Sequence, residues 1–264
     1  MDHMKGMELE VGIMEKKKKP LGMRIGESVF CIGYLLFALI AGLIFLKRCL
    51  HDPQYVNLTD DMYRFAALMT FALMIGDAFH LIPRVVINIG GEREKDAFWL
   101  GLGNLISSIT MTAFYILLYF VIYYATYPYH ISTIRPTLLD GFHRTFFILL
   151  MVFAVIRVVL CLFPQNNWFR REGNHKWSIL RNIPFTLMGV TMIIFLLMNY
   201  LKVHNGEILL SFLPAGSFVL MAVLVAFSFV FYLSVVLYAH KSPKMGMLMI
   251  PKTICYIALI AVLL

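Results

Sequence analysis

Residues Phe212–Tyr238 read FLPAGSFVLMAVLVAFSFVFYLSVVLY, a stretch without a single Asp, Glu, Lys or Arg. A helix that crosses the roughly 30 Å hydrocarbon core of a bilayer needs about 20 predominantly apolar residues, so this stretch predicts a transmembrane helix. Six further apolar stretches of similar length are Ser28–Leu46, Tyr63–Ile82, Phe98–Tyr124, Thr145–Phe163, Ile183–Leu201 and Met245–Leu264. The sequence therefore predicts an all-α, polytopic membrane helical bundle with seven transmembrane helices.

The composition excludes the other large classes of protein. Hydrophobic residues make up 60% of the 264 residues, charged residues 14%, and the mean hydropathy is +0.78. Soluble domains have about 45–50% apolar and about 25% charged residues, and disordered, collagen-like and coiled-coil chains need compositions that are absent here. The four cysteines are scattered singly, without histidines in ligand spacing, so we expect no disulfide, no metal site and no cofactor.

The basic residues predict the orientation, because cytoplasmic loops retain Lys and Arg. The connections on one side, together with the amino-terminal segment, carry 15 of them, and the connections on the other side carry 5. We therefore expect a basic cytoplasmic tail over residues 1–27 and a transmembrane domain over residues 28–264, with the carboxyl terminus outside. The net charge of +8 is then explained by orientation and contact with membrane lipids, and not by nucleic acid. This charge asymmetry and the short loops favour a bacterial plasma membrane.

Ionisable residues inside the predicted spans are few, and each is costly in hydrocarbon. Asp77, His80 and Arg84 follow one another at i, i+3 and i+7, so they share one face of the second helix, which Pro83 is expected to end. Arg157 lies at a matching depth in the fourth helix. An Asp77–Arg157 ion pair is the simplest explanation of both charges.

Further polar residues gather in the same inner half of the bundle. The candidate binding residues are Arg84, Asn104, Ser107, Ser108, Arg157, Arg181, Asn182 and Tyr232. They predict a polar cavity that opens toward the cytoplasm beneath an apolar roof. Lys252, beside Pro251, is assigned instead to the membrane interface, where lysine side chains snorkel. In the alternative interpretation, Asp77 and Arg157 only fix the helix register, and the serines and asparagines join the helices by hydrogen bonds.

A partial likeness to a known family covers about residues 71–120. Gly76-Asp77 near the inner end of an early helix, followed by a helix that opens Phe98-x-x-Gly101-Leu102, resembles the lysoplasmalogenase-like membrane family. The resemblance implies a polytopic helical bundle that hydrolyses the vinyl-ether bond of lysoplasmalogens with intramembrane aspartates, Asp77 being one of them. Ile109 stands where that family has a histidine, and Ser228-Phe229 stands where it has a later Ser-Asp pair.

The functional expectation is a cytoplasm-facing cavity that handles a lipid, a lysolipid or another amphiphilic small molecule. In a lysolipid hydrolase, Asp77 would be the general acid or base acting through a water, and His80 would be its relay. Arg157 or Arg84 would anchor a phosphate or carbonyl group. The alternative is a non-catalytic protein, either a lipid-binding or transport protein or the membrane subunit of a larger complex.

Overall fold

The computed structural model describes residues 20–50, 60–91, 95–126, 141–169, 173–208, 211–238 and 243–264. Its long helices are α2 (Leu21–Cys49), α3 (Asp60–Gly90), α4 (Asp96–Thr126), α5 (Gly141–Leu162), α6 (His175–His204), α7 (Ala215–Tyr238) and α8 (Met249–Leu263). Two short 3₁₀ helices, η1 (Pro164–Asn166) and η2 (Pro243–Leu248), precede α6 and α8. Seven helices, the last counted together with the end of η2, are long and apolar enough to cross a membrane, which confirms the predicted number of spans.

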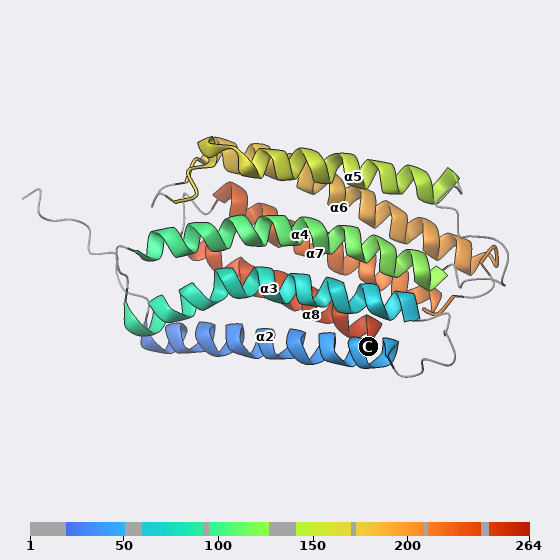
Figure 1. Cartoon of the computed structure of the whole chain (residues 1–264), viewed down its shortest axis with the longest axis horizontal. Helices are drawn as coiled ribbons and strands as arrows, with labels where there is room; N and C mark the ends of the chain where they lie inside the picture. Colours follow the sequence, from blue (N-terminus) through green and yellow to red (C-terminus); the bar gives the residue numbers. More distant parts are fainter. Residues whose placement is uncertain are drawn as a thin grey trace, which may run out of the picture.

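The seven helices form one bundle around a buried core. In Figure 1, α5, α4, α3 and α2 lie side by side in that order, with α6, α7 and α8 behind them. Consecutive helices pack against each other, α2 also meets α8, and α4 also contacts α6. Exposed large apolar side chains occur on every one of the seven helices, as expected for a surface that faces lipid.

The chain enters α2 earlier than the sequence indicated. Pro20 precedes the helix, and its carbonyl accepts hydrogen bonds from the amides of Met23 and Arg24 at 3.0 and 3.2 Å. The last part of the expected tail, Leu21–Glu27, is therefore helical, because proline favours the start of a helix. Residues 1–19 lie outside the described residues, as do Arg93, Arg135, Arg170, Arg171 and Lys241, which contributed to the orientation count. The orientation remains a prediction.

The expectation that Pro83 ends the second span is wrong, since α3 continues through it to Gly90. A proline inside a helix cannot donate to the carbonyl four residues earlier, here that of Phe79. Gly103 of α4 lies directly against this carbonyl, where a Cβ atom would overlap it. Because Gly103 has no side chain, the α4 backbone approaches the turn of α3 that Pro83 interrupts. The α4 helix therefore supports α3 at this point. In Figure 1 the last turns of α3 run toward the start of α2.

We expect Gly103→Ala to destabilise the protein, because the new methyl group collides with backbone that cannot rotate away. Overpacking of this kind typically costs about 1–3 kcal/mol in the free energy of unfolding. Thermal unfolding of the protein in detergent measures the loss. Gly33→Ala is the matched control, because a Cβ atom there meets nothing within 4 Å. Equal unfolding temperatures for the two variants would show that the close approach at Gly103 is unimportant.

Candidate functional site

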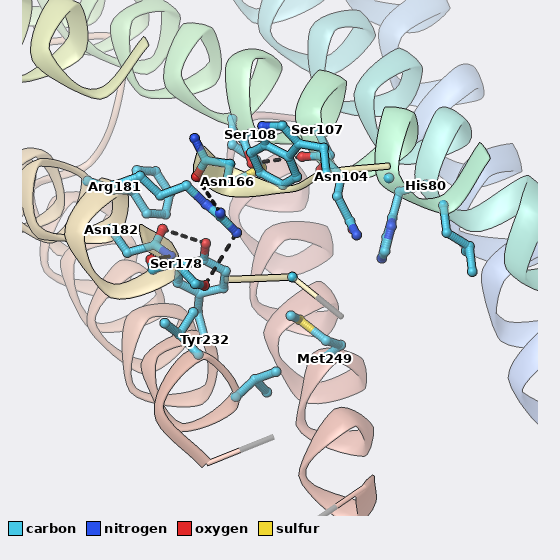
Figure 2. A pocket seen from close by; sticks show the side chains of 18 of the residues that line it. His80, Asn104, Ser107, Ser108, Asn166, Ser178, Arg181, Asn182, Tyr232 and Met249 are labelled. Carbon is cyan, nitrogen blue, oxygen red and sulfur yellow. Dashed lines mark hydrogen bonds between the residues drawn. The ribbon is translucent and has the colours of Figure 1, made fainter. Parts of the chain in front are cut away.

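One cavity of about 1080 Å³ lies at the end of the bundle where α2 begins, which we call the Leu21 end. All ten residues singled out from the sequence line it: Asp77, His80, Arg84, Asn104, Ser107, Ser108, Arg157, Arg181, Asn182 and Tyr232. They come from α3, α4, α5, α6 and α7, and Figure 2 shows seven of them labelled around the space. The residues that the sequence placed at one depth therefore line a single cavity.

Packed rings close the cavity on the side facing the bundle core. Phe185 lines it, and behind this ring lie Tyr115 and Phe229, with centroids 5.4 and 4.9 Å from that of Phe185. Tyr115 is fully buried, and Phe229 nearly so. The predicted roof beneath the outer leaflet depends on the orientation of the bundle and stays a prediction.

Asp77 is held by neighbouring helices and not by Arg157. Its Oδ2 accepts a hydrogen bond from the Tyr34 hydroxyl of α2 at 2.7 Å, and its Oδ1 accepts one from the Ser107 hydroxyl of α4 at 3.2 Å. Asp77 and Arg157 are both described, and they form no ion pair within 4 Å. The predicted pair is therefore corrected: equal depth in two helices does not bring side chains together when the helices lie on different sides of a cavity.

Lys252 is the positively charged residue that interacts electrostatically with Asp77. The two side chains attract each other electrostatically across the cavity wall. The Lys252 ammonium lies 4.9 Å from the ring centroid of Tyr232 and 5.3 Å from that of Tyr256. Lys252 also lines the cavity, so its ammonium does not snorkel along a lipid-facing surface as the sequence predicted. The start of α8 contributes Met249, Lys252 and Thr253 to the cavity lining.

We expect Asp77 and Lys252 to be energetically coupled, and Asp77 and Arg157 to be nearly independent. A double-mutant cycle of Asp77→Asn with Lys252→Met should give a coupling of about 0.5–3 kcal/mol in the free energy of unfolding, the range found for interacting neighbours. The same cycle with Arg157→Met is the control. A larger coupling to Arg157 would restore the original assignment of the pair.

Arg157 is the most unusual side chain of the site. It is only 2% exposed, and its guanidinium carbon lies 3.3 Å from the ring centroid of Phe185. Tyr232 and Cys161 flank it and interact favourably with its positive charge. Within the described part of the chain, its Nε and Nη1 have no hydrogen-bond partner. Such a buried cation is expensive unless a further group pairs with it.

Arg181 is positioned by a polar framework that follows the end of α5. Its Nη1 donates to Asn166 Oδ1 at 2.8 Å and its Nη2 donates to Ser178 Oγ at 3.3 Å, while the guanidinium lies 4.0 Å from the Trp168 ring centroid (Figure 2). The Asn166 amide in turn donates to the carbonyls of Leu160, Cys161 and Phe163 at 2.7, 3.3 and 2.9 Å. Asn166 therefore closes the free carboxyl end of α5 and orients Arg181 at the same time.

Asn182 and Tyr232 fasten α6 to α7. The Tyr232 hydroxyl donates to Asn182 Oδ1 at 2.7 Å, and Asn182 Nδ2 donates to the Ser178 carbonyl at 2.7 Å (Figure 2). Ser108 donates within α4 to the carbonyl of Asn104 at 2.7 Å, whereas the Asn104 side chain is exposed. Much of the predicted polar set thus shapes the cavity wall.

His80 forms no direct hydrogen bond with Asp77, whose two carboxylate oxygens accept from Tyr34 and Ser107. The role of His80 as a relay for Asp77 stays a prediction. His80 Nδ1 is buried and has no hydrogen-bond partner among the described residues. Arg84 reaches away from Asp77 and pairs with Glu27 of α2 at 3.7 Å.

Sequence reasoning missed Tyr34 and Phe185. Tyr34 is a buried tyrosine in the middle of the first span, and a hydroxyl at that position needs a hydrogen-bond partner, which was the available signal. Phe185 is one of many phenylalanines, so nothing in the sequence distinguishes it.

Among the described residues, no three His, Cys, Asp or Glu side chains gather in a way that could hold a metal ion. Comparisons with family models, curated proteins and solved structures found no match.

Proposed function

We propose that this membrane protein binds an anionic amphiphile, with the acidic headgroup in the cavity at the Leu21 end. The observation that carries the proposal is the Arg157 guanidinium, which is buried beside the cavity and has two nitrogens without a hydrogen-bond partner among the described residues. Removing such a cation from water costs several kcal/mol, and the contacts with Phe185, Tyr232 and Cys161 return only part of this cost. An anionic ligand would offset the rest of the cost of burying Arg157.

The charges around the cavity favour the same ligand. Arg157 is close enough to Arg181 and to Lys252 for the like charges to repel, and Asp77 is the one acidic residue in the described lining. A phosphate or carboxylate among these cations would relieve the repulsion. Arginine suits such groups because its planar fork donates two parallel hydrogen bonds. Since the cavity is enclosed by membrane-spanning helices, the rest of the ligand would be a lipid-like hydrocarbon.

The experiment compares headgroups that share one chain. Purified protein in nanodiscs is titrated with 1-palmitoyl lysophosphatidylglycerol, which is anionic, and with 1-palmitoyl lysophosphatidylcholine, which is zwitterionic. We expect the anionic lysolipid to bind at least about tenfold more tightly, a difference of about 1.4 kcal/mol. Titration with glycerol 3-phosphate distinguishes a lipid headgroup from a free phosphate ester. Equal affinity for the two lysolipids would contradict the proposal.

A second candidate is hydrolysis of such a lysolipid, the activity implied by the family resemblance. The specific observation in its favour is His80 Nδ1, a buried nitrogen without a hydrogen-bond partner in the described part of the chain, on the same helix face as Asp77 and beside the same cavity. His80 would then exchange protons with a substrate or a water directly, not through Asp77. Product release from lysoplasmalogen and from lysophospholipid tests this candidate, with Asp77→Asn and His80→Asn as variants. Turnover that survives both substitutions would exclude these two residues from catalysis.

A further inference from the structure

A second cavity, of about 480 Å³, lies between α2, α3 and the start of α8. Its lining is mostly apolar and includes Phe30 and Ile250, with methionines at positions 23, 247 and 249. Methionine side chains are flexible and adapt to ligands of variable shape. The volume falls within the range of about 300–1,000 Å³ that is usual for small-molecule sites.

The second cavity adjoins the first. Leu81, Arg84, Met249 and Thr253 line both, so the two spaces are adjacent. Arg84 at this junction pairs with Glu27, which lines the second cavity. A polar boundary of this kind separates a charged compartment from an apolar one, the arrangement that suits a molecule with one headgroup and one chain.

Glycines create part of the open space. Gly26 on α2 and Gly246 in η2 both line the second cavity, and a Cβ atom added at either would meet nothing within 4 Å. The α2 backbone therefore borders the cavity with no side chain filling it at position 26. The α2 helix and the segment Met245–Leu263 are long and apolar enough to cross a membrane, so the cavity is bordered by helices that lipid chains would surround.

We infer that the second cavity holds the single hydrocarbon chain of the anionic amphiphile whose headgroup lies among Arg157, Arg181 and Lys252. This inference rests on the proposed function and narrows the ligand to one-chain lipids such as lysophospholipids. The chain would pass Arg84 and lie along α2 at Gly26, between Phe30 and Ile250. Affinity should then rise with chain length, and the gain should depend on the space beside Gly26.

The test is Gly26→Leu, which fills part of the second cavity, whose lining does not include Arg157, Arg181 or Lys252. For 1-palmitoyl lysophosphatidylglycerol in nanodiscs we expect binding to weaken at least about tenfold. Binding of 1-hexanoyl lysophosphatidylglycerol should change little, because its short chain hardly reaches the cavity. Gly33→Leu is the matched control, two turns along α2, where a Cβ atom also meets nothing within 4 Å and no lining contact exists. Unchanged palmitoyl binding in Gly26→Leu would overturn the inference.

Two further results separate this inference from the function on which it rests. If Arg157→Met abolishes binding while Gly26→Leu does not, the headgroup site stands and the chain site is wrong. If neither substitution weakens binding, the proposed function itself fails.

A lysophosphatidylglycerol with a diazirine at the end of its chain provides a measurement on the unaltered protein, which does not depend on variants folding. Crosslinks to residues 23–31 and 246–250 would support the assignment, and crosslinks confined to other helices would overturn it.

Discussion

Replacing Arg157 with methionine should abolish tight binding of an anionic lysolipid while leaving the empty protein as stable as before, or more stable. Truncating one member of a buried charge pair typically costs about 2–5 kcal/mol of binding free energy. A loss of this size weakens binding at least about 30-fold. Without the ligand, however, the substitution removes a buried guanidinium whose Nε and Nη1 have no partner in the described structure. Replacing buried charges by apolar groups is often neutral or stabilising.

The opposite signs of these two effects distinguish a binding residue from a structural one. A residue that holds the helices together would lose stability on substitution, whereas a residue kept for a ligand would lose affinity alone. Arg144→Met is the control, because Arg144 lies near the beginning of the same helix and is exposed. Unfolding curves and titrations of both variants give the answer. A clear drop in the stability of Arg157→Met, with affinity retained, would assign Arg157 to the fold.

Asn166→Ala should have the largest effect on stability. The Asn166 side chain is 1% exposed, and its amide donates to backbone carbonyls at the end of α5 while its oxygen accepts from Arg181. Alanine would leave several of these groups without partners, and each buried unsatisfied group costs about 1–3 kcal/mol. We expect a loss of about 3 kcal/mol in the free energy of unfolding, together with weaker lysolipid binding because Arg181 loses its orientation.

Gln165→Ala is the matched control for this prediction. Gln165 belongs to the same 3₁₀ turn but is exposed, so its substitution should change the unfolding free energy by less than about 0.5 kcal/mol. Chemical unfolding in mixed micelles compares the two variants with the wild type. Similar curves for both would mean that the turn, and not the Asn166 side chain, closes α5.

The spans could be predicted because membrane thickness imposes a length on any apolar helix. The ends of the helices could not be predicted, since they depend on contacts outside the hydrocarbon. Leu21–Glu27 is helical because Pro20 starts the helix and because this segment meets the end of α3, where Arg24 donates to the Asn88 carbonyl. Pro83 stays inside α3 because Gly103, distant in sequence, accommodates the bend. Helix propensity alone carries no information about such a neighbour.

The membership of the candidate site was predictable, whereas its pairings were not. Counting residues along antiparallel spans gives depth, and depth was enough to group Asp77 with Arg157 and Tyr232. Pairing also requires the rotation of each helix and the identity of its lateral neighbours, which only packing determines. Asp77 consequently lies between Tyr34 and Ser107 and faces the charge of Lys252.

The lipid that copurifies with the protein tests the anion site at Arg157 most directly. Wild type, Arg157→Met and Arg144→Met are purified in parallel in mild detergent, and each is examined by native mass spectrometry and by quantitative lipid extraction. We expect a bound anionic one-chain amphiphile on the wild type and on Arg144→Met, and its loss from Arg157→Met. The same bound lipids on all three proteins, or none on any of them, would contradict an anion site at Arg157.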